Sequence, residues 1–343
     1  MKLNTMRKPF KLQQNIIMLF VMGALFGLFS LVNPNLLDKY MLQTMVQRFA
    51  PYAIMGLGVT FVIATGGIDL SLGTVMIASS VMAGKLFTDG ILPLWATIPV
   101  MIAIGTLCGF LNGVMVAKLK IPAFIATLGM MLVSRGLSAL IAAVPNIFYP
   151  TGTWFNKVFS NHTFFDVIPV GLIWILGMML ICMYLMYKNR AGRYTLAIGS
   201  NEEATRLSGI NTDNYKILAY TIAGLSCGVA AIFWSASFPT VPAGSGNGME
   251  LDAIAGVYIG GTSAAGGVAS VSGSVIGAAL LEVIRTGLNM VLAKLGVNLN
   301  ATYVTYVLTG VIVVVAILLD IMKTKNQNKL KIEKPATKEP AKK

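Results

Sequence analysis

The chain has 343 residues, of which 56% are hydrophobic and 11% are charged, and its mean hydropathy is +0.75. Soluble domains carry roughly 25% charged residues, so this composition excludes a soluble fold and indicates an integral membrane protein. The formal net charge of +13 would also suit a nucleic-acid-binding protein, but lysine and arginine mark the cytoplasmic loops of membrane proteins as well. We therefore expect the basic residues to contact membrane lipid, and we expect no nucleic-acid partner.

The apolar runs are continuous rather than alternating, which favours helices over a barrel. Because about 20 helical residues cross a hydrocarbon core of roughly 30 Å, the sequence predicts an all-α polytopic membrane protein with about ten transmembrane helices, some short or broken. The expected spans, in chain order, are 12–32, 50–65, 72–88, 93–117, 122–143, 168–187, 217–238, 251–270, 273–292 and 303–321.

Three basic segments set the expected sidedness: the N-terminus, the loop 188–216 and the lysine-rich tail. All three should lie in the cytoplasm, since cytoplasmic loops are enriched in lysine and arginine. An even number of spans must then follow the loop, which is why 251–270 is predicted as a span although it is glycine-rich and contains Asp252. The prediction is a transmembrane domain over 1–321, both termini cytoplasmic, and a basic disordered tail over 322–343.

Two acidic segments with glycines interrupt the apolar runs, ATGGIDLSLG in the first half and GNGMELDAIAGVYIGGT in the second. An acid near the bilayer centre costs about 2.5–3.5 kcal/mol unless it faces water or a partner. Asp69 and Ser71 in the first segment, and Glu250 and Asp252 in the second, are therefore candidates for a translocation pathway or gate. The alternative is that Asp69 caps the helix that follows it.

These two segments follow the second and the seventh expected span, on opposite sides of the membrane. That placement is typical of an inverted repeat, here spans 2–5 against spans 7–10, with a broken helix beside a cavity. The sequence similarity between the two segments is faint, and the repeat is a hypothesis.

Glycines four residues apart occur in several expected spans, where they let helices approach closely. They predict a compact bundle rather than any chemistry. The pairs are Gly23/Gly27, Gly105/Gly109/Gly113, Gly224/Gly228, Gly256/Gly260 and Gly273/Gly277.

Three charged residues, Arg135, Glu282 and Arg285, lie well inside expected spans. Glu282 and Arg285 are three residues apart, and this spacing favours a local ion pair on one helix face over a polar pathway. Arg135 has no partner nearby in the sequence, and its role is left open.

The chain contains no GxxxxGK[ST] loop, and its single histidine, His162, lies in an expected outer loop. No Ser/His/Asp or Cys/His set and no metal cluster can be assembled from these residues. We therefore expect no enzyme, no catalytic residue, no metal site and no cofactor in this chain.

The runs GVTFVIATGGIDLSLG, PAFIATLGMMLVSRG, GRYTLAIGSNEEATRLSGIN and ELDAIAGVYIGGTSAAGG carry a resemblance that spans about residues 16–322. They resemble the permease subunit of bacterial sugar ABC importers, most of all its ribose/galactose/xylose group. The resemblance implies a permease domain over 1–321 in the bacterial inner membrane that translocates a monosaccharide, a ribose-like pentose or a hexose. As partners it implies a cytoplasmic ATPase subunit that binds ATP and Mg²⁺, an extracytoplasmic sugar-binding protein, and a second permease copy or paralogue.

The resemblance also assigns the loop 188–216 to docking on the ATPase. Independently, Asn201 followed by two acids predicts the start of a short helix, and Gly209 its end. A short rigid helix between two spans can transmit a push, whereas a solvated connector, the alternative, cannot. The residues assigned to ATPase coupling are Gly199, Asn201, Glu202, Ala204, Arg206, Leu207, Ser208 and Gly209.

Two other functions are open for the whole chain. An ion-coupled secondary transporter of a small polar solute is the first alternative, with Asp69 and Asp252 as ion or proton sites. A membrane-embedded enzyme ranks third, because no catalytic set is present in the sequence.

Overall fold

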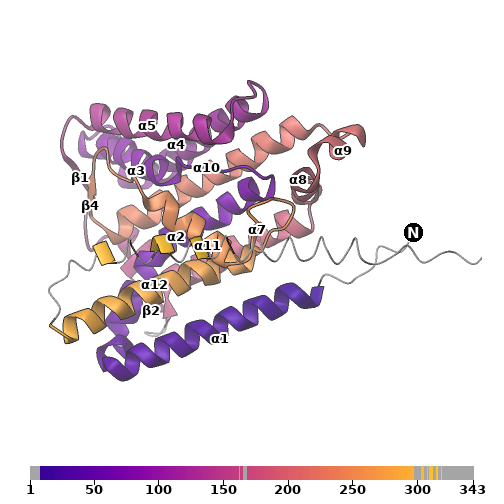
Figure 1. Cartoon of the computed structure of the whole chain (residues 1–343). Coiled ribbons are helices and arrows are strands. Elements are labelled where there is room, and N and C mark those ends of the chain that lie inside the picture. Colours follow the sequence, from indigo (N-terminus) through magenta and orange to yellow (C-terminus); the bar gives the residue numbers. More distant parts are fainter. Residues whose placement is uncertain are drawn as a thin grey trace, which may run out of the picture.

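The computed structural model describes residues 8–161, 163–164 and 168–296, together with scattered residues between 303 and 318. Within this part of the chain, seven helices are long and apolar enough to cross a membrane. This confirms an α-helical, polytopic membrane protein. Figure 1 shows α4 and α5 along one flank and α12 and α1 along the other, with α2, α3, α10 and α11 between them.

The first half of the chain contains α1 (Lys8–Val32), the turn η1 (Pro34–Leu37), α2 (Lys39–Ala64), α3 (Leu72–Thr88), η2 (Leu94–Ala96), α4 (Thr97–Ala117) and α5 (Ala123–Ala142). The middle contains β1 (Asn146–Phe148), α6 (Trp154–Asn156), η3 (Lys157–Asn161), β2 (Thr163–Phe164), β3 (Ile168–Pro169), α7 (Val170–Tyr187), α8 (Arg190–Ser200) and α9 (Glu202–Leu207). The last part contains α10 (Thr212–Ser237), β4 (Thr240–Pro242), α11 (Met249–Ile259) and α12 (Val271–Lys294).

Helix α2 is much longer than the span expected at 50–65, which was wrong at its start. The helix begins at Lys39, where the Asp38 carboxylate caps it by accepting from the backbone N–H of Tyr40 at 2.8 Å. Pro51, which would suit a first helical turn, lies inside the helix instead. The expected span includes only the apolar part of α2, so it omits the polar first turns of the helix.

Helix α11 is shorter than the span expected at 251–270. It ends at Ile259 after eleven residues, which corresponds to about 16 Å at 1.5 Å per residue, roughly half of a hydrocarbon core. A glycine-rich segment with positive φ at Gly261, Gly266 and Gly267 follows. A continuous helix over 251–270 was therefore wrong, and a count of ten full spans is not confirmed. The span expected at 303–321 lies mostly outside the described residues, as does the tail 322–343.

The predicted close approach of helices is confirmed where α4 crosses α10. A Cβ added at Gly105 would overlap the carbonyl oxygen of Gly224, and one added at Gly109 would overlap that of Tyr220. A Cβ at Gly224 would in turn meet the backbone of Gly105 and Gly109. The two backbones are thus in direct contact, which only glycine permits at these positions.

A second glycine contact joins α11 to α12. Gly260 faces Gly273 and Gly277 faces Gly256, in each case with room for no side chain. By contrast, Gly23 in α1 has no atom within 4 Å of an added Cβ. The glycine pair of α1 therefore makes no such contact within the described chain.

A two-stranded ribbon links the ends of α5 and α10. Strands β1 and β4 are antiparallel, with Ile147 opposite Val241. Arg135 of α5, whose role was open, donates from Nε to the carbonyl oxygen of Gly244 just beyond β4, at 2.8 Å. Arg135 is thus part of this connection.

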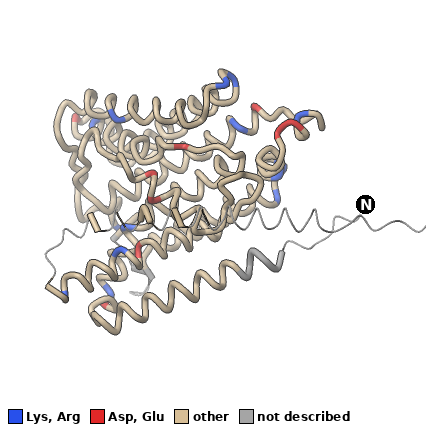
Figure 2. The backbone as a smooth tube through the Cα atoms, viewed as in Figure 1, with Lys and Arg blue, Asp and Glu red and all other residues tan. Residues whose placement is uncertain are grey.

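Several basic residues lie at the end of the bundle that carries α8 and α9, opposite the ribbon, and other basic residues lie at the ribbon end and within the helices (Figure 2). The first described turn of α1 lies at the end with α8 and α9 (Figure 1). The basic residues at this end are Lys118, Lys120, Lys188, Arg190, Arg193, Arg206 and Lys216.

Candidate functional site

The predicted short helix of the loop 188–216 is confirmed as α9. Its N-cap is Asn201, whose Oδ1 accepts from the backbone N–H of Ala204 at 2.9 Å. Gly209 follows the helix with φ +81°, a conformation that favours glycine. Both ends were predictable because capping depends on residues only a few positions apart. The helix α8, which fills the first part of the loop, was not foreseen.

Glu202 fixes α9 to the base of α10. Its carboxylate accepts from Lys216 at 2.6 Å, from Arg206 at 3.2 Å and from Thr212 at 3.3 Å. Partial burial raises the pKa of the Glu202 carboxyl, but the hydrogen bond and charge of Lys216, with the other two partners, outweigh burial and lower it. Glu202 is therefore held as an anion that links α9 to a membrane span.

The opposite face of α9 is open. Leu207 is 84% exposed. Ala204, Arg206 and Ser208 are exposed as well. The helix thus offers a mixed apolar and polar surface at the basic end of the bundle.

Gly199, near the end of α8, lies against two other backbone segments. An added Cβ would overlap the carbonyl oxygen of Ala64 at the end of α2 and the backbone N–H group of Gly267. That N–H of Gly267 also donates to Ala64 O at 3.0 Å. The end of α8, the end of α2 and the segment before α12 therefore meet without intervening side chains, and we call this contact the Gly199 junction.

Asp69 and Ser71 form a closed hydrogen-bonded cluster at the start of α3. Asp69 is 1% exposed, and its Oδ1 accepts from the Ser71 backbone N–H at 2.9 Å and from the Ser71 hydroxyl at 2.7 Å. Asn112 of α4 donates to the same hydroxyl at 2.9 Å. These contacts favour the interpretation of Asp69 as the residue that organises the turn before α3.

Glu250 is also buried, at 5% exposed, in the first turn of α11. Its two carboxylate oxygens accept from the backbone N–H of Gly248 at 3.0 and 3.1 Å. An added Cβ at Gly73 would lie 3.0 Å from Glu250 Oε2. Glu250, in the second interrupted segment, therefore packs against the beginning of α3, where the first interrupted segment ends.

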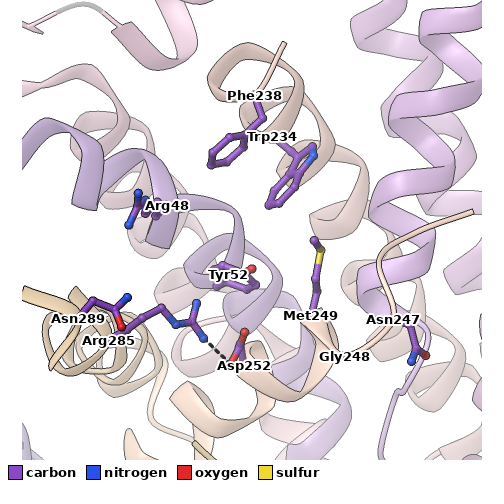
Figure 3. A pocket seen from close by; sticks show the side chains of 10 residues that line it. All are labelled: Arg48, Tyr52, Trp234, Phe238, Asn247, Gly248, Met249, Asp252, Arg285 and Asn289. Carbon is purple, nitrogen blue, oxygen red and sulfur yellow. Dashed lines mark ion pairs between the residues drawn. The ribbon is translucent and has the colours of Figure 1, made fainter. Parts of the chain in front are cut away.

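A cavity of about 460 Å³ lies between α2, α10, α11 and α12 (Figure 3). Of the four residues predicted for a pathway or gate, Asp252 lines this cavity and the other three do not. The lining residues are Arg48, Tyr52, Trp234, Phe238, Asn247, Gly248, Met249, Asp252, Arg285 and Asn289.

The charged wall of the cavity is an ion pair between two helices. Arg285 of α12 contacts Asp252 of α11 at 2.9 Å, and its guanidinium carbon lies 5.9 Å from the centre of the Tyr52 ring. The predicted local pair between Glu282 and Arg285 was wrong, because Glu282 instead accepts from the Thr286 hydroxyl at 2.8 Å. Arg285 therefore pairs with Asp252, 33 positions away on another helix, and not with Glu282 on its own helix.

The opposite wall is aromatic. The rings of Trp234 and Phe238 lie 4.5 Å apart between centroids, with an interplanar angle of 43°. None of these residues was foreseen, and an aromatic near a helix end is more often part of an interfacial belt. The cavity combines an aromatic wall with converging polar groups, the usual composition of a small-molecule site.

Comparisons with known proteins agree over most of the chain. The family model described as "Branched-chain amino acid transport system / permease component" matches residues 40–317. The ribose import permease protein RbsC of Escherichia coli (strain K12) is 36% identical over 90% of this chain and 93% of its own length. The fructose import permease protein FruF of Bifidobacterium longum is 34% identical over 80% of this chain and 76% of its own.

A relative named for a different solute also matches. The autoinducer 2 import system permease protein LsrC of Photorhabdus luminescens is 31% identical over 88% of this chain and 91% of its own length. No solved structure matches this chain. The family match covers well over half of the sequence, and the chain therefore belongs to this family of transport-system permease components.

Proposed function

We propose that this chain is the membrane-spanning permease subunit of an ATP-binding-cassette importer that translocates a monosaccharide. The observation that carries the proposal is the match to ribose and fructose import permeases over 80–90% of the chain. A cavity with an aromatic wall and an Asp–Arg wall supports it, since this lining suits a small polar molecule. We expect no catalytic group in this chain and expect ATP with Mg²⁺ to bind a partner ATPase.

We place the end of the bundle with α8 and α9 in the cytoplasm of a bacterial cell, where the ATPase subunit docks on the open face of α9. Basic residues at this end support this orientation. The opposite end then faces an extracytoplasmic sugar-binding protein. A second permease copy or paralogue completes the pathway. In this arrangement the domain covers 1–321 with about ten membrane segments, α11 being a partial one, and the tail 322–343 is cytoplasmic.

The Gly199 junction explains how movement of α9 reaches the membrane. A displacement of α9 would be transmitted through α8 to the end of α2 and to the segment before α12. The backbones of α8, α2 and this segment are in direct contact at the Gly199 junction. Both α2 and α12 line the cavity. The ATPase shifts the permease between two states only if it binds them with different affinities, and displacement of the junction supplies that difference.

Reconstitution tests the proposal. The permease, its ATPase subunit and its binding protein are placed in lipid vesicles, and uptake of labelled ribose, xylose, galactose and fructose is measured. We expect uptake that requires ATP and all components and that ionophores leave unchanged. Uptake by the permease alone along an ion gradient would instead establish a secondary transporter.

Reversal of one charge on α9 is expected to uncouple the transporter. Arg206→Glu removes the 3.2 Å contact with Glu202 and adds a third acid to a short helix. Uptake should be lost and co-purification of the ATPase weakened, while the amount of membrane-inserted permease stays the same.

Gly209→Pro should have the same effect, since proline cannot adopt φ +81°. Lys157→Glu, the same charge change on an exposed residue at the opposite end, is the control and should leave ATPase co-purification intact. Normal co-purification and uptake in both α9 variants would contradict the assignment of α9 as the docking helix.

A further inference from the structure

The cavity lies in the half of the bundle away from α9. Its residues Trp234 and Phe238 stand at the end of α10, and Asn289 stands near the end of α12. Its side chains come from four separate helices, with the aromatic rings on one side and Asp252 with Arg285 on the other (Figure 3). A molecule that enters from the end opposite to α9 would therefore meet this cavity before the Gly199 junction.

Two polar atoms of the lining residues have no hydrogen-bond partner within the described part of the chain. They are Nε1 of Trp234, which can only donate, and Oδ1 of Asn289, which can only accept. Both atoms are buried. Buried polar atoms in proteins are normally paired, so a pair of unsatisfied atoms of opposite kind beside one cavity indicates a place for a ligand that both donates and accepts.

The charged side chains of the cavity can donate hydrogen bonds to a ligand and accept hydrogen bonds from it. Arg285 is paired with Asp252 at 2.9 Å. Arg48 also lines the cavity, and the buried Glu282 interacts electrostatically with both arginines. Glu282 does not line the cavity, so within the lining Arg285 is paired with Asp252 and Arg48 can donate to an oxygen of a ligand. A neutral molecule rich in hydroxyl groups satisfies paired charges by hydrogen bonds to both.

We propose that this cavity is a transient binding site for the transported monosaccharide, resting on the proposed function. The rings of Trp234 and Phe238 face the carbon–hydrogen face of the sugar, and Asp252, Arg285 and Asn289 contact its hydroxyl groups. The volume of about 460 Å³ lies within the range of roughly 300–1,000 Å³ that is typical of small-molecule pockets. The site is weak, because a permease fed by a binding protein must release what it takes up.

Binding to the purified permease in lipid nanodiscs tests the site directly. Saturation-transfer NMR suits weak ligands, and the probes are ribose, xylose, galactose and fructose, with leucine as a zwitterionic contrast of similar size. We expect at least one sugar to bind in the wild type and leucine to give no signal. Binding of leucine in competition with the sugar would overturn the assignment to a neutral polyol.

Substitutions of the aromatic wall locate the binding. Trp234→Leu removes the ring and should weaken sugar binding about threefold to tenfold, the range expected for the loss of one aromatic contact. Trp234→Phe keeps a ring and should retain most of the binding. Trp95→Leu changes an exposed tryptophan outside the cavity and should have no effect. Equal binding in all three variants would overturn the proposal.

Uptake in reconstituted vesicles separates this site from the proposed function. If the wild type imports a sugar with ATP and Trp234→Leu imports it equally well, the cavity is not the site although the chain is a sugar permease. If no sugar is imported by the wild type, the proposed function itself fails. A fall in uptake with Trp234→Leu, restored by Trp234→Phe, supports both.

Discussion

A single methyl group at position 199 is expected to stop ATP-driven uptake. In a helix, glycine to alanine normally stabilises by about 1 kcal/mol, but here the added Cβ would overlap the carbonyl oxygen of Ala64 and the backbone of Gly267. Backbone atoms cannot rotate aside, and such overpacking typically costs about 1–3 kcal/mol. Gly199→Ala should therefore lower uptake at least about fivefold.

The matched control is Gly177→Ala in α7, an exposed helical glycine with no atom within 4 Å of an added Cβ. This variant should transport like the wild type. The measurement is sugar uptake in vesicles together with ATPase co-purification. With Gly199→Ala, the ATPase should remain bound while its hydrolysis no longer drives uptake. Normal uptake in Gly199→Ala would show that the Gly199 junction carries no coupling.

Leucine in place of Gly224 is expected to prevent a stable permease from forming. The side chain would enter the contact where α10 meets Gly105 and Gly109 of α4. The α4–α10 crossing has direct backbone contact, so the helices must separate to admit any side chain, and the dispersion contacts along the crossing are lost. We expect a strong fall in the yield of monodisperse protein and a lower thermal unfolding midpoint in detergent.

Gly129→Leu is the control for this substitution. Gly129 is an exposed position of α5, and an added Cβ there has no neighbour within 4 Å. A leucine at that position faces the surroundings of the bundle and should leave both yield and unfolding midpoint unchanged. Equal behaviour of the two variants would mean that close approach of α4 and α10 is dispensable.

Local signals in the sequence predicted local structure well. The short helix α9 followed from Asn201 and Gly209 because capping involves neighbours in the chain. The glycine spacing in α4 and α10 predicted close packing for a similar reason, since residues four apart share one helix face. The same spacing did not say which helices meet, and the contact of Gly105 with Gly224 required the folded structure.

Features that depend on distant partners were missed or misplaced. Asp252 was a candidate because an unpaired acid is costly in lipid. Its partner Arg285 lies on another helix, whereas sequence spacing predicted that Arg285 pairs with Glu282. The aromatic wall was missed because Trp234 and Phe238 lie at the end of an ordinary apolar helix. The span at 251–270 was extended by an argument on topology, whereas glycines with positive φ end α11 at Ile259.

The β1–β4 ribbon limits which walls of the cavity are free to move. Beyond the paired residues, Tyr149 N–H donates to Pro239 O at 2.8 Å, and the Tyr149 hydroxyl donates to Ser80 O of α3 at 2.7 Å. Paired strands cannot slide past each other without breaking these bonds, so α3, α5 and α10 form one rigid block at this end. The aromatic wall belongs to that block and stays fixed. An entrance to the cavity is therefore expected to open by movement of α2, α11 or α12 relative to this block.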